Sequence, residues 1–197
     1  MKGMWKQFCK AVDSGRPGPG RPGRRSGYGS DRVGRVPVPI EQAQGPRQVT
    51  LDLPGYIQTS SYSCGATSAA MVVHRFRPRM GFERIYDAVD PSPEIGAEPL
   101  QVVQALRSCG LRVSHRKKLS FARLCRAIDR GRPIVVLIHN HGSEDDHWVV
   151  VYGYGRRPDR LFIAVNGVPW FNRNRIARSR FERIWKPPGN GLVCWKK

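Results

Sequence analysis

Cys64 has the sequence context of an activated nucleophile. The thiol follows a run of hydroxyl residues at 60–63 and precedes a stretch of small and apolar residues without proline until Pro78. This pattern predicts a buried helix of about three turns with Cys64 in its first turn. A helix N-terminus stabilises a thiolate, which is the reactive form of cysteine. The serines of the run are candidate helix caps: Ser60, Ser61 and Ser63.

Two neighbours of Cys64 suit the chemistry of acyl transfer. Gly65 has no Cβ, which lets another backbone approach closely beside the sulfur. Gln58 lies six residues before Cys64, where a loop can fold its side-chain amide back to donate a hydrogen bond to an oxyanion. The other four cysteines lack an activating context, and none forms a CxxC pair, which indicates a reducing or mixed environment. They are Cys9, Cys109, Cys125 and Cys194.

A histidine and an asparagine on two predicted strands supply the remaining groups. Residues 146–155 and 160–167 have strand composition, and the turn-forming segment 155–159 between them predicts an antiparallel hairpin. A regular register makes His147 and Asn166 near cross-strand neighbours, with Cβ atoms about 5 Å apart. Asn166 can then fix the tautomer of His147, as the third member of a nucleophile, base and orienter set does.

These residues together resemble the papain-like cysteine peptidases. A Gln, then Cys-Gly after five residues, then a distant His leading a strand and an Asn on the next strand occur in that order. More narrowly, the chain resembles the double-glycine leader (bacteriocin-processing) peptidases, in which a Gly-Arg/Lys-Pro-hydrophobic strand precedes the His strand. Residues 131–138 match that strand, and the similarity covers roughly residues 50 to 170.

The resemblance implies a thiol peptidase that acts on a peptide or protein substrate. Cys64 is then the nucleophile, His147 the base and acid, and Asn166 the orienter. Gln58 helps the Cys64 N–H to stabilise the oxyanion. The chain departs from the leader-peptidase pattern at Asn166, where Asp followed by Pro is usual, and at the acidic run 144–146 before the histidine. The same machinery could also carry out deamidation or acyl transfer.

The elements that must position these groups predict an α+β fold. Apolar residues at helical spacing indicate helices that start near Phe82, near Pro99 and after Ser120, the last of which closes at Gly131. Strands take over from Pro133. Helices first and antiparallel strands later indicate a papain-like fold, with the N-terminal helical half packed on the sheet that carries His147 and the site in the cleft between them.

Composition divides the chain into two parts. The 197 residues carry a net charge of +19 and are 40% hydrophobic, which is enough for one core. Residues 1–45 are rich in Gly, Pro and Arg and predict a disordered basic arm, while residues 46–197 form the peptidase domain. The arm is either a solvated spacer, which we favour, or an electrostatic tether to nucleic acid, an anionic surface or an acidic partner.

Arginines and aromatic residues interleave beyond Val168. We favour an edge element whose aromatic side chains pack inward, although such a pattern can also bind single-stranded nucleic acid. A second class of function therefore stays open. The chain would then be a catalytically silent papain-like scaffold that binds nucleic acid or an acidic partner through its basic segments.

Nothing in the sequence indicates a membrane segment or a metal site. The first ten residues contain no apolar run of signal-peptide length, and no segment approaches the length of a membrane span, so we expect a cytoplasmic protein. His139 and His141 lie at one strand end without a third ligand at suitable spacing, so we expect no zinc. We also expect a monomer without a cofactor.

Overall fold

The structure is a computed structural model that describes residues 48–139, 146–156, 159–164, 174–187 and 189–197. The predicted arm at 1–45 lies outside these residues. The helices and strands follow the order β1 (Gln48–Thr50), α2 (Cys64–Phe76), α3 (Phe82–Val89), α4 (Pro99–Ser108), β2 (Leu111–Arg116), α5 (Phe121–Asp129), β3 (Ile134–His139), β4 (Asp146–Arg156), β5 (Asp159–Ala164), β6 (Asn174–Ala177), α6 (Arg178–Ile184), β7 (Trp185–Lys186) and β8 (Gly191–Lys196).

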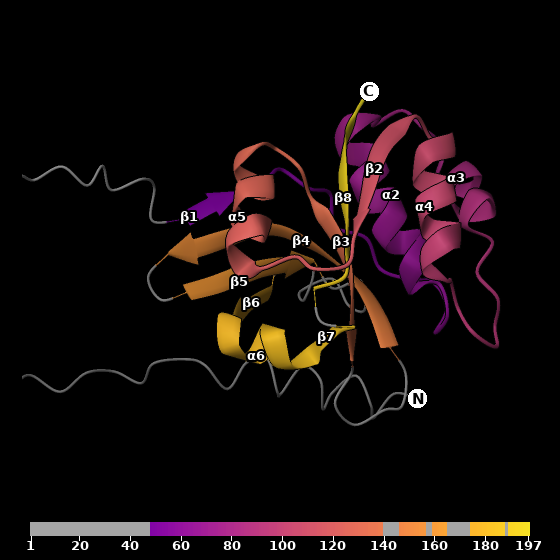
Figure 1. Ribbon diagram of the computed structural model, residues 1–197. Helices are drawn as coiled ribbons and strands as arrows, with labels where there is room; N and C mark the ends of the chain where they lie inside the picture. Colours follow the sequence, from indigo (N-terminus) through magenta and orange to yellow (C-terminus); the bar gives the residue numbers. More distant parts are fainter. Residues whose placement is uncertain (1–47, 140–145, 157–158, 165–173, 188) are drawn as a thin grey trace, which may run out of the picture.

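One antiparallel sheet separates two groups of helices (Figure 1). Its strands lie in the order β2-β8-β3-β4-β5-β6, with β1 beside β4 and β7 beside β3. Helices α2, α3 and α4 cover one face, and α5 and α6 cover the other. Each face has its own hydrophobic core. The predicted α+β class, with a helical half packed on an antiparallel sheet, is therefore confirmed.

Helix α2 is the predicted buried helix, and Cys64 is its first residue. Every residue from Cys64 to Val73 is buried, because the helix lies between α3, α4 and strand β4. Its small residues allow this close packing on all sides. The predicted side-chain caps are not formed, since Ser63 is the N-cap residue but its hydroxyl makes no capping hydrogen bond.

The next three helices begin where the sequence predicts. Glu98 and Gln101 form a capping box at the start of α4. The side chain of Ser120 accepts a hydrogen bond from the Arg123 N–H at the start of α5. After α5 the chain turns at Gly131, whose φ of +72° suits a residue without Cβ.

The predicted hairpin is formed by β4 and β5, but its register differs from the prediction. Arg156 pairs with Asp159, so the centre of the hairpin lies one residue later than 156.5. A bulge between Val151 and Gly153 then shifts the register again. The assumption of a regular ladder was therefore wrong, because a β-bulge adds one residue to a single strand.

Five strands were not predicted: β1, β2, β6, β7 and β8. Strand β2 lies between α4 and α5, in a region that we interpreted as helical, and its register partner is the C-terminal strand β8. Strand β8 lies inside the sheet between β2 and β3, whereas β6 of the same C-terminal segment is the edge strand beside β5. Strand β2 is short, and its hydrogen bonds to a strand that is distant in sequence stabilise it.

Aromatic residues of the C-terminal segment do pack inward. The Phe181 and Trp185 side chains are buried, and their ring centroids lie 4.9 Å apart in the core beneath α6. Trp170 and Phe171 lie outside the described residues. Among the helices that the structure describes, none has the length and apolar character needed to cross a bilayer.

Candidate active site

A tight turn connects Gln58 to the start of α2. The Gln58 Nε2 atom donates a hydrogen bond to the Ser60 carbonyl oxygen at 2.8 Å. The Ser63 hydroxyl accepts a hydrogen bond from the Ser60 N–H and donates one to the Ser60 carbonyl oxygen, each at 3.1 Å. These bonds link Gln58 to the residue that directly precedes Cys64. They hold the Gln58 amide in the turn that leads into α2, and its approach to the Cys64 sulfur stays a prediction.

The Gln58 side chain keeps donor capacity in this arrangement. A carboxamide nitrogen carries two N–H bonds, and the bond to Ser60 uses one of them. The Gln58 Oε1 atom is buried and accepts no hydrogen bond from the described residues. A buried amide beside a helix N-terminus is suited to bind an anionic oxygen, because the first N–H groups of a helix also have no partner within the helix.

Trp148 joins the start of α2 to the start of β4. Its indole Nε1 donates to the Ala97 carbonyl at 2.8 Å, and its own carbonyl accepts a hydrogen bond from the Ser68 hydroxyl at 3.1 Å. Both bonds are buried. Trp148 therefore fixes strand β4 against both α2 and the loop that precedes α4.

Gly65 allows this contact. A Cβ built on Gly65 would lie 2.7 Å from the Ala97 Cβ and 3.1 Å from the Trp148 Cδ1. The glycine thus admits a close neighbour, as predicted, but the neighbours are side chains rather than a backbone. Residue 65 follows Cys64 and residue 148 follows His147. The packing of Gly65 on Trp148 therefore brings the elements of both candidate catalytic residues together.

Cys64 and His147 are both almost buried. Their exposed fractions are 7% and 8%. His147 is the second residue of β4 and pairs with Ile138 of β3. At this exposure both groups are largely shielded from bulk water. Asn166 lies outside the described residues, beyond the last described residue of β5.

Of the other cysteines that the structure describes, two have environments that oppose thiolate formation and the third is only partly enclosed. Burial raises the pKa of the Cys109 thiol at the end of α4 and of the Cys194 thiol in β8. Cys125 is half-buried and packs against the core beneath α5. No group of three or more metal-ligating side chains occurs within the described parts of the chain.

Gly65→Ala is expected to destabilise the protein by about 1–3 kcal/mol, because the new methyl group overlaps Ala97 and Trp148. The greater helix propensity of alanine offsets at most about 1 kcal/mol of this. Urea denaturation measures the change. Gly81→Ala is the control, since a Cβ there meets no atom within 4 Å, and its free energy of unfolding should change by less than about 0.5 kcal/mol. Equal stability of the two variants would contradict the proposed packing.

A family known from sequence matches most of the described chain. The Peptidase_C39 like family matches residues 50–192, which includes α2, the hairpin and the start of β8. The chain belongs to this family. The C39-like assignment confirms the resemblance drawn from Gln58, Cys64 and His147, and it establishes the class of the protein as a cysteine-type peptidase. No match was found among curated protein sequences.

Solved structures share the fold of the C39-like domain. A double glycine motif protease from an AMS/PCAT transporter, solved with its leader peptide, is 19% identical with a TM-score of 0.58, covering 76% of this chain and 95% of that chain. The peptidase domain of Streptococcus ComA, a bi-functional ABC transporter, is 21% identical with a TM-score of 0.60, covering 74% and 98%. The Carica candamarcensis cysteine protease CMS1MS2 is 14% identical with a TM-score of 0.53, covering 77% and 99%.

The sequence interpretation of the C39-like site missed the residues that hold its parts together. Trp148, Ser68 and Ala97 connect β4, α2 and the loop before α4. Trp148 directly follows the candidate base, and this adjacency in sequence was the available signal. Its buried indole N–H needs a hydrogen-bond acceptor, but the sequence does not reveal that Ala97 supplies it.

Proposed function

We propose that the C39-like domain hydrolyses peptide bonds with Cys64 as nucleophile and His147 as general base and acid. Asn166 orients the imidazole, and Gln58 and the Cys64 N–H stabilise the oxyanion. The observation that carries this proposal is the packing of Gly65 on Trp148, because each of these residues directly follows one of the two reacting groups. The hydrogen-bonded turn from Gln58 to Ser63 supports the oxyanion role.

The proposed reaction proceeds through a thioester. His147 accepts the proton of the Cys64 thiol, and the thiolate attacks the carbonyl carbon of the scissile bond. The carbonyl oxygen becomes an anion that receives hydrogen bonds from the Gln58 amide and the backbone N–H of Cys64. His147 then donates its proton to the leaving amine as the carbon–nitrogen bond breaks. Water activated by His147 hydrolyses the thioester and releases the free thiol.

The proposed substrate is a peptide or an unfolded segment of a protein. One structurally similar protease binds a leader peptide, and an extended segment can deliver its carbonyl to a site in which sulfur and imidazole are almost buried. Exposed apolar side chains near the start of α2 and the loop before α4 can contact such a segment: Ile57, Ile95 and Leu100.

The test is digestion of a denatured protein by the full chain under reducing conditions, followed by mass spectrometry of the products. We expect pairs of new amino and carboxyl termini that come from cleaved peptide bonds. Conversion of side-chain amides to carboxylates without cleavage would contradict the proposal and identify a deamidase. Complete absence of either product from a panel of unfolded proteins would also contradict it.

A further inference from the structure

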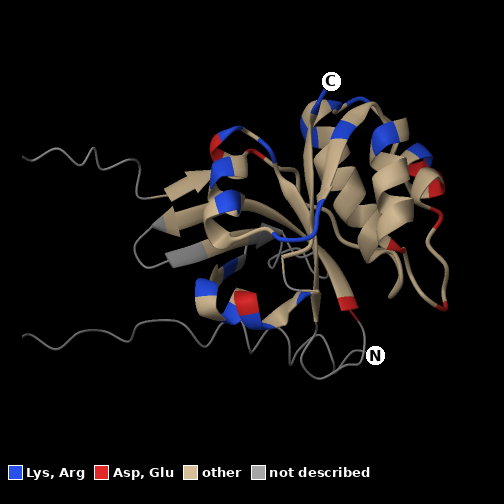
Figure 2. Cartoon of the chain, in the orientation of Figure 1, with Lys and Arg blue, Asp and Glu red and all other residues tan. Residues whose placement is uncertain are grey.

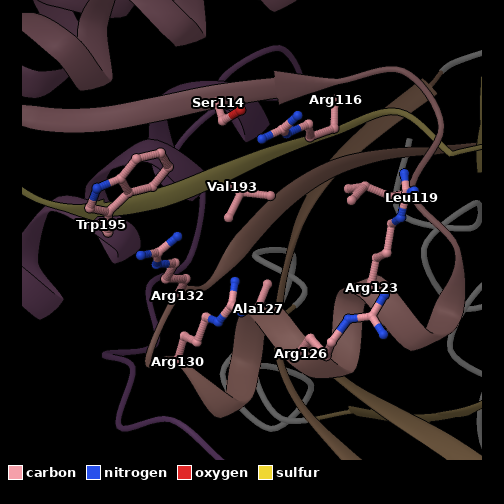
Figure 3. A pocket seen from close by; sticks show the side chains of 10 residues that line it. All are labelled: Ser114, Arg116, Leu119, Arg123, Arg126, Ala127, Arg130, Arg132, Val193 and Trp195. Carbon is pink, nitrogen blue, oxygen red and sulfur yellow. The ribbon is translucent and has the colours of Figure 1, made fainter.

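Five arginines and a tryptophan surround a cavity on the side of the sheet that α5 covers. The cavity has a volume of about 350 Å³. Figure 3 shows that Arg116 approaches from β2 on one side of Val193, while Arg130 and Arg132 lie on the other side. The residues that carry charge or an aromatic ring are Arg116, Arg123, Arg126, Arg130, Arg132 and Trp195.

Local structure explains why these arginines converge. Arg123, Arg126 and Arg130 are three, four and seven residues apart, so they share one face of α5 and its C-terminal end. The left-handed turn at Gly131 then places Arg132 beside the same face. The Arg132 guanidinium carbon lies 4.6 Å from the centre of the Trp195 ring.

The strand pair β2–β8 supplies the opposite wall of the cavity. Ser114 of β2 pairs with Val193 of β8, which places Arg116 across from the end of α5. The floor is apolar and buried, and it consists of Leu119, Ala127 and Val193. The charged groups therefore stand around an apolar base, an arrangement that can hold a compact ligand.

Carboxylates of the described residues do not neutralise this cluster. No ion pair within the described ranges includes one of the five arginines. Asp129, the acidic residue of α5, accepts a hydrogen bond from the Tyr154 hydroxyl at 2.5 Å instead. Figure 2 shows lysines and arginines gathered along α5 and the loop that follows β2. The arginines therefore repel one another, and a bound anion would relieve that repulsion.

The volume and the charge together favour phosphate over carboxylate. A terminal phosphate carries a charge of about −1.5 to −2 at neutral pH, and its oxygens match the planar fork of arginine. Two or three linked phosphates can therefore balance several guanidinium groups within 350 Å³. A peptide would need about five carboxylates in the same space. The cavity size is also at the lower end of the range for small-molecule sites, about 300–1,000 Å³.

We propose that this cavity binds a small ligand with clustered phosphate groups, of the class that includes inorganic triphosphate and nucleoside triphosphates. None of its lining residues belongs to α2 or β4, so the site is separate from the candidate peptidase site. The proposal does not depend on peptide hydrolysis. The Trp195 ring lies at the edge of the same cavity and can contact a nucleobase if the ligand carries one.

Thermal unfolding and calorimetric titration of the full chain test this proposal. In magnesium-free buffer at physiological salt, inorganic triphosphate and ATP should each raise Tm by about 5–10 °C at about 100 times Kd. Equal affinities for both would indicate that the site recognises phosphate alone. Tighter binding of ATP, lost in Trp195→Leu, would indicate a nucleotide site. Both of these results support the proposal.

A matched pair of variants separates the cavity from the general positive charge of the chain. Arg116→Gln combined with Arg130→Gln should weaken triphosphate binding roughly tenfold for each contact that is lost. Arg79→Gln combined with Arg84→Gln removes the same charge from exposed positions before and within α3, and binding should change by less than about twofold.

Three results would overturn the proposal. The first is that neither triphosphate nor ATP changes Tm. The second is that both double variants weaken binding equally, which would indicate a nonspecific effect of net charge. The third is that only single-stranded DNA or a hexaglutamate peptide binds at physiological salt, which would assign the cluster to a nucleic acid or an acidic protein.

Discussion

Cys64→Ala is expected to reduce peptide hydrolysis by about 10⁴-fold or more, because the thioester cannot form without the sulfur. The residual rate would come from substrate binding and oxyanion stabilisation alone. The variant should keep its fold, since Cys64 is the first residue of α2 and alanine suits both the helix and the neighbouring small side chains. The measurement is kcat/KM on a peptide identified in the digestion experiment.

Cys125→Ala is the matched control for this variant. Cys125 is a half-buried thiol on α5, the helix that covers the face of the sheet opposite α2 (Figure 1). Its removal should change kcat/KM by less than about twofold, because Cys125 lies on a different helix from the proposed nucleophile. Hydrolysis that survives in Cys64→Ala but not in Cys125→Ala would exclude the proposed nucleophile.

His147→Ala is expected to reduce kcat/KM by about 10³–10⁴-fold, because the thiol then lacks both the base that removes its proton and the acid that protonates the leaving amine. His147 is 8% exposed, so removal of the ring also leaves a small cavity. Circular dichroism and thermal unfolding must therefore show that the variant is folded at the assay temperature.

His139→Ala is the control for the loss of an imidazole from the same region of the sheet. His139 ends β3, and its Nδ1 lies 3.2 Å from the Asp146 carboxylate at the start of β4. Because that pair is partly exposed, its loss should change stability by no more than about 1 kcal/mol. Activity should fall by less than about threefold. A larger loss in His139→Ala than in His147→Ala would reverse the assignment of the base.

Local sequence patterns predicted the elements that depend on near neighbours. Helix α2 could be predicted because it has a long run of small and apolar residues without a breaker. The α5 boundaries could be predicted because both depend on local residues. Ser120 caps the start of the helix with a side-chain hydrogen bond, and Gly131 ends it with a positive φ. The hairpin could be predicted because its strands are adjacent in sequence, although its bulge could not.

Features that depend on distant partners could not be predicted from the sequence. Strand β2 is held by β8, and nothing near Leu111 indicates that its partner lies at the other end of the chain. The contact of Gly65 with Trp148 likewise joins residues that are far apart in sequence. The arginine cavity is formed by α5 together with strands β2 and β8. Its charges appeared in the sequence only as part of a widespread excess.

Cysteine alkylation is the measurement that tests the central claim most directly. The full chain is treated with iodoacetamide at pH 6, and mass spectrometry follows the labelling rate of each cysteine. We expect Cys64 to react well ahead of all others, since burial raises the pKa of Cys109 and Cys194 and disfavours their thiolates. The Cys64 rate should fall at least about tenfold in His147→Ala. Slow labelling of Cys64 at the rate of Cys125, unchanged in His147→Ala, would contradict an activated thiol.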